Sequence, residues 1–150
     1  MGSDPASGSA PPSGSDPVGA DVAPGLEGIT EETVAEDATA ASVGSGDVAV
    51  LATPAVLALV ERAAVAALHG RLGPDRTSVG SSVSLDHLAP TPVGGLVRAT
   101  VRLERVEGRR LSFSFVVIDG AGRVAEGSHV RVVVDRRRFE AAARARLGEG

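Results

Sequence analysis

The longest apolar segment of the chain predicts one central helix. Residues 53–68 read TPAVLALVERAAVAAL, and Glu61 is the only acid among them. Thr53 is of a residue type that caps free backbone amides, and Pro54 suits the first helical position, so the helix is expected to begin here. It is expected to end at His69–Gly70, because glycine adopts the left-handed conformation that closes helices. A helix that is apolar nearly all round is expected to be wrapped by other elements.

Alternating apolar and polar positions predict strands in the second half of the chain. Val83, Leu85 and His87 share one face of the first strand. Three more strands are expected over residues 96–106, 111–118 and 124–134. The links between these last three are short, which suits antiparallel hairpins. The remaining elements expected are a first strand over 26–34, a short helix over 36–42, a loop at 44–47 and an arginine-rich helix ending at Leu147 that Asp135 caps.

These elements predict an α+β fold, in which one buried helix precedes a four-stranded antiparallel meander. A single curved sheet around the helix would satisfy the need to wrap it. Residues 1–22 are mostly Gly, Ala, Ser, Pro and Asp, so we expect a disordered tail followed by a single domain over 23–150. The tail lacks the cationic start and apolar stretch of a secretory signal. No apolar run reaches the roughly 18 residues that span a bilayer, so no membrane partner is expected.

Composition narrows the chemistry further. Cysteine is absent, which removes disulfides and thiolate nucleophiles and fits a cytoplasmic location. All 15 Lys and Arg residues are arginine, so Schiff-base chemistry is excluded. A net charge of −4 argues against a nucleic-acid partner. The three histidines lack the spacing of metal ligands, so no metal site is expected.

Glu61 is the first candidate for catalysis. Its helical neighbours are the apolar residues Leu57, Ala58, Ala64, Val65 and Leu68. A lone carboxylate there is costly unless another group pairs with it or a reaction uses it. Burial raises the pKa of a carboxyl group, which suits an acid or base near neutral pH. The alternative is a structural acid that pairs with an arginine.

Two further side chains are candidates with Glu61. His87 is expected to face the core, and its ordinary pKa of about 6.5 allows proton exchange near neutrality; the alternative is a core histidine without chemistry. Thr53 is on sequence grounds more simply an N-cap than a catalyst. The two roles are compatible, because a hydroxyl at a helix start lies beside free amides that stabilise an anion.

The order and spacing of these residues match a known family. The run VEGRRLSFSFVVIDGAGRVAEGSHVRVVV, together with the Ala52–Thr53 pair, Glu61 and the strand that carries Gly80 and His87, resembles the hotdog-fold thioesterases related to fluoroacetyl-CoA thioesterase. The resemblance covers roughly residues 48–139. It implies a hotdog fold, a homodimer with acyl sites at its interface, and hydrolysis of a short acyl-CoA without any cofactor beyond the CoA of the substrate.

The resemblance also implies individual roles. Thr53, Glu61 and His87 would be catalytic, while Gly80 and Arg131 would contact the substrate. The alternatives without a role in substrate binding are an ordinary strand-entry glycine at Gly80 and a sheet-surface arginine at Arg131. Two positions depart from the family: Pro54 replaces a glycine, and Asp47 stands where the fluoroacetyl enzyme has a phenylalanine that lids the acyl pocket. The second departure puts fluoroacetyl selectivity in question, while thioester hydrolysis stays the expected activity.

Two other functions remain open at this point. One is a non-catalytic hotdog protein that binds acyl-CoA or serves in regulation. The other is a hotdog hydratase or dehydratase, which would process an enoyl or hydroxyacyl thioester without releasing CoA.

Overall fold

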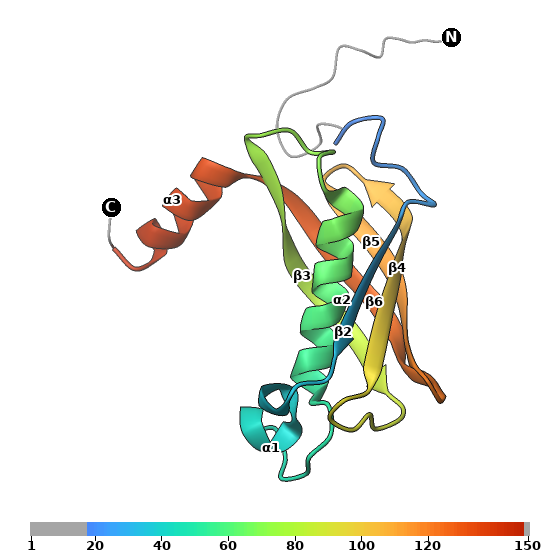
Figure 1. The fold of residues 1–150 in the computed structure, drawn as a ribbon. Coiled ribbons are helices and arrows are strands. Elements are labelled where there is room, and N and C mark those ends of the chain that lie inside the picture. The colour runs from blue at the N-terminus through green and yellow to red at the C-terminus, as the bar shows by residue number, and fades with distance from the viewer. Residues whose placement is uncertain (1–17, 149–150) are drawn as a thin grey trace.

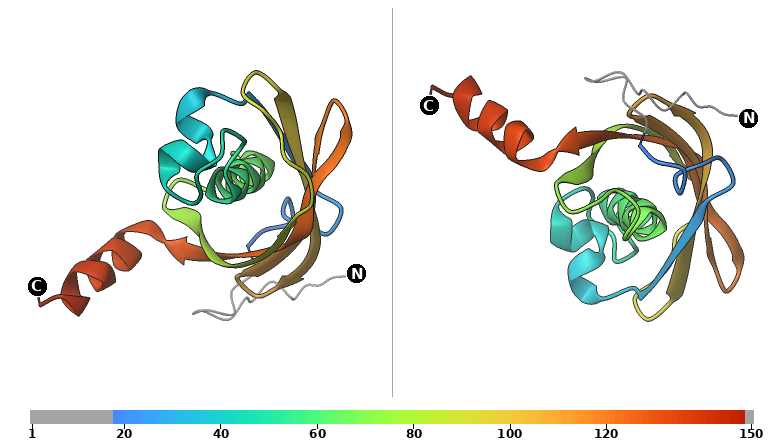
Figure 2. Two further views of the ribbon diagram at one scale, coloured as in Figure 1. Left: turned by 90° about the horizontal axis from the view of Figure 1, so that it is seen from below. Right: turned by 90° about the horizontal axis from the view of Figure 1, so that it is seen from above.

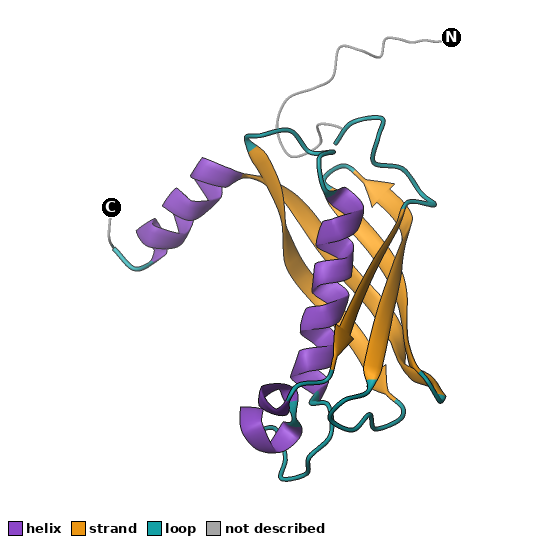
Figure 3. Cartoon of the chain, in the orientation of Figure 1, coloured by secondary structure: helices purple, strands orange, loops and turns teal. Residues whose placement is uncertain are grey.

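One long helix and a five-stranded antiparallel sheet form the body of the molecule (Figures 1 and 3). The computed structural model describes residues 18–148. Its strands follow the order β2-β4-β5-β6-β3 across the sheet. Along the chain the elements are β2 (Glu27–Thr33), the 3-10 helix η2 (Glu36–Ala38), α1 (Ala40–Val43), α2 (Thr53–Leu68), β3 (Arg76–His87), β4 (Leu96–Glu107), β5 (Arg110–Asp119), β6 (Gly122–Asp135) and α3 (Arg136–Arg146).

Helix α2 has the predicted bounds, and the sheet curves around one side of it. Figure 2 shows the helix end-on inside this curve, with α3 projecting away from the body of the molecule. The inner face of the sheet is apolar because alternate residues of each strand point toward α2. On β5, for example, Leu111, Phe113, Phe115 and Val117 are all buried, as their alternation predicts. The expected α+β class and wrapped helix are therefore confirmed.

The predicted meander is wrong in its strand order. Strand β3 does not pair with β4, which follows it in sequence, but with β6 at the far end of the sheet. The link between β3 and β4 therefore carries the chain from one edge of the sheet to the other side of β5 and β6. Strand β2, expected as a weak first strand, pairs with β4 and forms the opposite edge. Consequently β3 is an edge strand with one neighbour among the described strands, and its residues 80–84 are exposed.

Three local predictions change. The short helix expected over residues 36–42 is split into η2 and α1. Val18 and Val22, which the composition assigns to the tail, are buried in the hydrophobic core, whereas the expectation of disorder for residues 1–17 lies outside the described residues. Asp135 precedes α3 as expected, but its side chain makes no capping hydrogen bond. None of the helices within residues 18–148 is long and apolar enough to cross a membrane.

Strand β2 lies very close to α2 because it has a glycine where the two cross. A Cβ atom placed on Gly28 would overlap the backbone carbonyl oxygen of Ala63 and would also press on Ala67. These contacts are to helix backbone, which cannot swing aside as a flexible side chain can. Gly28 thereby sets how tightly the first strand closes over the helix.

We predict that Gly28→Ala destabilises the protein by about 3 kcal/mol, at the upper end of typical overpacking costs. Urea unfolding followed by circular dichroism measures the effect. Gly120→Ala is the matched control, since a Cβ there meets nothing within 4 Å and Gly120 needs no left-handed backbone. Equal stability of the two variants would contradict the proposed close approach.

Candidate active site

Thr53 and His87 meet at the N-terminal end of α2. The Thr53 Oγ1 atom lies 2.7 Å from His87 Nδ1, so the hydroxyl and the ring share a hydrogen bond. His87 is the last residue of β3, and its Nε2 atom is buried without a partner among the described residues. A buried, unpaired imidazole nitrogen is energetically costly, which makes His87 a candidate for a chemical role.

The expected capping role of Thr53 is wrong. The helix begins at Thr53 itself, with Ala52 at the N-cap position, and no side chain caps its free amides. Proline occupies the first turn, as predicted. Because the Thr53 side chain is turned toward β3, its hydroxyl is available to His87 instead of the backbone.

Arg131 anchors a second cluster on the inner face of the sheet. Its side chain is only 7% exposed, and its guanidinium lies 3.6 Å from the Glu61 carboxylate, measured from Nη1 to Oε2. Nε donates to Ser78 Oγ at 2.8 Å and Nη2 donates to the Ser78 carbonyl at 3.0 Å. Burial lowers the pKa of Arg131, and the charge of Glu61 acts in the opposite direction. Arg131 is therefore an inward-facing arginine and not a sheet-surface one.

His129 completes this cluster, and sequence reasoning left it without a role. It is 2% exposed and stacks on Phe113, with ring centroids 6.4 Å apart. Its Nδ1 lies 2.9 Å from the Ser82 carbonyl, which only accepts, so Nδ1 carries the proton. Nε2 is then free to accept from Arg131 Nη1 at 3.2 Å. The sequence did hold a signal for this role: His129 and Arg131 are two residues apart on β6, so both side chains lie on the same face of the sheet.

Glu61 is less buried than its apolar helical neighbours suggest. Its side chain is 42% exposed, so the carboxylate is only partly buried in this chain. The carboxylate borders a hollow of about 180 Å³ between α2 and β3, which Gly80 and His129 also line. The other lining residues are Leu57, Ser81, Ser82 and Val83. Such a hollow accommodates a small acyl group beside a carboxylate and a buried guanidinium.

A β-bulge brings Gly80 onto the inner face. Gly80 pairs with Arg131 and Ser82 pairs with Val130, so Ser81 is an extra residue in the ladder. This insertion shifts the alternation, and Gly80 joins the face of His87. A Cβ on Gly80 would lie 2.5 Å from Glu61 Oε2, so the position has to be glycine for the carboxylate to rest there.

The five predicted site residues thus form two groups within one chain. Thr53 contacts His87, while Glu61, Gly80 and Arg131 lie together. Glu61 follows Thr53 by eight residues, a rise of about 12 Å along the helix axis. A single chain therefore does not bring Thr53, Glu61 and His87 into one triad. Within residues 18–148, no group of three or more acidic or histidine side chains is placed to hold a metal ion.

We predict that His129 makes stability depend on pH. Burial, the largest cause, lowers its pKa below the ordinary 6.5, and the neighbouring Arg131 charge acts in the same direction, against the Ser82 carbonyl and Glu61. A histidine with a lowered pKa stabilises the fold fully above about pH 6.5, and that contribution is lost as pH falls toward the folded-state pKa. Urea unfolding from pH 7.5 to pH 5 measures the slope.

His129→Gln should lose part of this slope, because glutamine does not titrate. His69 and His87 are present in both proteins, so their contributions cancel in the difference. Parallel pH profiles for the wild type and the variant would contradict the assignment of a neutral, buried imidazole.

Comparison with known proteins identifies the family of the chain. The profile of the fluoroacetyl-CoA-specific thioesterase family matches residues 34–137. Fluoroacetyl-CoA thioesterase of Streptantibioticus cattleyicolor is 37% identical over 101 residues, which cover 67% of this chain and 73% of that enzyme.

Solved structures show the same arrangement of helix and sheet. That of the fluoroacetyl-CoA thioesterase FlK has a TM-score of 0.78 at 30% identity, covering 83% of this chain and 96% of that one. A thioesterase superfamily member from Thermus thermophilus has a TM-score of 0.77 at 28% identity, covering 84% and 93%. A hot-dog-like protein from Thermanaerovibrio acidaminovorans has a TM-score of 0.76 at 30% identity, covering 82% and 91%. The chain therefore has the hotdog fold and belongs to the family of fluoroacetyl-CoA-specific thioesterases.

Proposed function

We propose that this thioester hydrolase cleaves short-chain acyl-CoA to the free acid and CoA, with Thr53, Glu61 and His87 as catalytic residues. The observation that carries the proposal is the placement of Glu61. Its carboxylate lies beside the Gly80 backbone and borders the small hollow, and the buried Arg131 supplies a counter-charge at 3.6 Å. A carboxylate held in this way is suited to act on a carbonyl carbon placed in the hollow.

The reaction needs few groups. Glu61 acts either as a base that takes a proton from attacking water or as a nucleophile that forms a transient acyl-enzyme. In both routes the carbon–sulfur bond breaks, CoA leaves as a thiolate that receives a proton, and water supplies the oxygen of the acid. His87 is the proton donor to the thiolate, and Thr53 orients its ring through the 2.7 Å hydrogen bond. Gly80 and Arg131 bind the acyl carbonyl or its substituent.

We further propose that the active form is a homodimer that pairs through β3. Within residues 18–148, β3 pairs with β6 alone, so its other edge presents unpaired backbone donors and acceptors. Its residues 80–84 are exposed, and so is Val65 on the adjoining face of α2. A second copy of the chain would cover both surfaces and continue the sheet.

The cytoplasmic location expected from the lack of cysteine stays a prediction.

This dimer would complete the triad. When β3 pairs antiparallel with its own copy, a two-fold axis between Val83 and Ser84 puts His87 of the partner subunit opposite Gly80. Gly80 and His87 are both on the inner face, so that imidazole would approach Glu61 on the same side of the sheet.

The acyl group is proposed to be short and unfluorinated. The hollow beside Glu61 measures about 180 Å³, which limits the chain length. Asp47 is exposed and carries a charge where the fluoroacetyl enzyme has a phenylalanine lid, so it offers no apolar cover over the acyl carbon. A panel of acetyl-, fluoroacetyl-, propionyl- and butyryl-CoA, with thiol release as the readout, defines the preference.

We predict that the wild type releases thiol from short acyl-CoA and that Glu61→Gln lowers kcat about 100-fold or more, the usual contribution of a positioned base or nucleophile. Glu104→Gln is the matched control, since its carboxylate bonds to Ser114 on the other face of the sheet. Near-wild-type turnover of folded Glu61→Gln would remove Glu61 from the mechanism. Wild-type binding of acyl-CoA without thiol release would indicate a binding protein, and processing of an enoyl thioester without release would indicate a hydratase.

We also predict that two inactive variants restore activity when mixed. Each proposed site combines Glu61 of one chain with His87 of the other. In a heterodimer of Glu61→Gln and His87→Asn, one site therefore has both substitutions and the other has neither. Random exchange of subunits makes about half of the dimers mixed, so about one quarter of wild-type activity is expected after refolding the two together. Each variant refolded alone is the control. No recovery in a mixture that sedimentation shows to be dimeric would mean that each chain supplies its own Glu61 and His87.

A further inference from the structure

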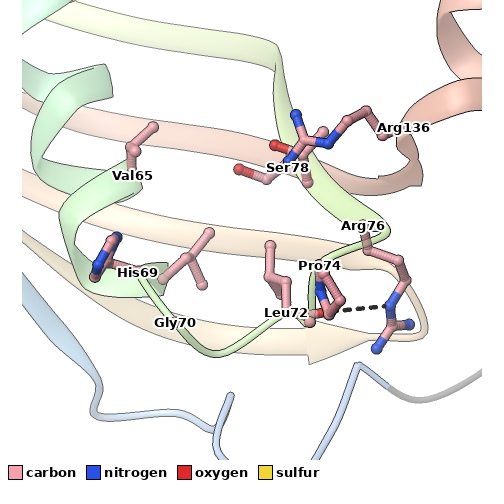
Figure 4. Close-up of a pocket in the computed structure, with 11 residues that line it drawn as sticks. Val65, His69, Gly70, Leu72, Pro74, Arg76, Ser78 and Arg136 are labelled. Carbon is pink, nitrogen blue, oxygen red and sulfur yellow. Dashed lines mark hydrogen bonds between the residues drawn. The ribbon is translucent and has the colours of Figure 1, made fainter.

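A second and larger cavity lies at the C-terminal end of α2 (Figure 4). It measures about 480 Å³ and lies between the last turn of α2, the start of β3 and the start of α3. Arg76, Arg136 and His69 line it, and no carboxylate does. In a chain of net charge −4, this is a local concentration of positive charge around an open space.

Both arginines keep their charge available to a ligand. Among the described residues, the partners of Arg76 are the backbone carbonyls of Leu72 and Val18, each at 3.3 Å. The sequence neighbours of the two arginines include Asp75 and Asp135, yet within residues 18–148 neither guanidinium forms an ion pair with a carboxylate. Figure 4 shows the Arg136 side chain extending from α3 to the side of Ser78. The two cations therefore approach the cavity from different elements and are held there without neutralisation.

The cavity and the hollow beside Glu61 both lie along the seam between α2 and β3. Val65 lines the cavity and comes one helical turn after Glu61 on α2. On β3, Ser78 lines the cavity and also binds Arg131, while Gly80 lines the hollow. The four residues from Gly80 back to Arg76 span about 13 Å of extended strand. A ligand laid along this seam would reach the carboxylate with one end and the arginines with the other.

We propose that this cavity binds the phosphate groups at the nucleotide end of the CoA thioester, with Arg76 and Arg136 as ligands. The inference rests on the proposed function. CoA carries a diphosphate and a 3′-phosphate, and an extended arm without charge joins them to the reacting sulfur. The seam between α2 and β3 has a matching order of features: arginines at one end, Val65 and Ser78 in between, and Glu61 at the other, with the inward-facing Arg131 bonded to Ser78. Guanidinium groups bind phosphate through paired hydrogen bonds, which suits arginine at both positions.

The test compares two thioesters of the same acyl group. Acetyl-pantetheine has the reacting end of acetyl-CoA but lacks the nucleotide phosphates. Arg136→Gln should raise KM for acetyl-CoA roughly tenfold, the loss expected for one charged hydrogen bond, and leave kcat and the kinetics of acetyl-pantetheine unchanged. Arg76→Gln should act likewise. Its thermal unfolding is measured alongside, because the Arg76 guanidinium also holds the carbonyls of Leu72 and Val18.

Arg144→Gln is the matched control, since Arg144 lies on the same helix but does not line the cavity. Calorimetry with adenosine 3′,5′-bisphosphate gives a readout that needs no turnover. The wild type should bind this probe, and the Arg76 and Arg136 variants should bind it at least tenfold more weakly.

The outcomes separate this proposal from the hydrolysis itself. An equal rise of KM for both thioesters, or an equal effect of Arg144→Gln, would overturn the phosphate site. Hydrolysis of acetyl-CoA by a wild type that does not bind the bisphosphate would also overturn it, while leaving the proposed function intact. Bisphosphate binding that depends on the two arginines, without thiol release from either thioester, would keep the site and remove the hydrolysis.

Discussion

The buried guanidinium of Arg131 is the interaction on which the arrangement of this site depends. A cation with 7% of its side chain exposed is strongly destabilising unless its donors and its charge are satisfied. Ser78 and His129 satisfy the donors, and Glu61 supplies the counter-charge. These partners lie on β3, β6 and α2, so one side chain links the helix to two strands that are already paired with each other. The position of the Glu61 carboxylate is a consequence of this network.

The same network explains why the seam between α2 and β3 stays open. Elsewhere the helix packs on the sheet through small apolar residues such as Ala63 and Ala67, which allow close contact with β2. Next to β3 the helix presents Leu57, Glu61 and Val65, and the strand is exposed over residues 80–84. Closing this seam within one chain would bury the carboxylate with no further partner. An open seam instead leaves the Glu61 carboxylate partly exposed and accessible from solvent.

Local features of the sequence predicted local structure well. The bounds of α2 followed from its composition, Pro54 and Gly70, and the buried face of β5 followed from simple alternation. The strand order did not follow, because a long link between β3 and β4 allows several pairings and the sequence pattern does not choose among them. The bulge at Ser81 could not be predicted from the sequence pattern either. Plain alternation puts Gly80 on the face opposite His87, whereas one extra residue brings both to the inner face.

The resemblance to hotdog thioesterases named five residues, and the structure adds how they are grouped. Thr53 with His87, and Glu61 with Gly80 and Arg131, are contacts that depend on tertiary structure and not on spacing. A matched motif states which residue types are present but not which chain supplies each one to a given site. The rise of about 12 Å between Thr53 and Glu61 on a rigid helix is the physical reason. Because side-chain rotation alone does not close that distance, we propose that a site using both groups on one carbonyl draws them from two chains.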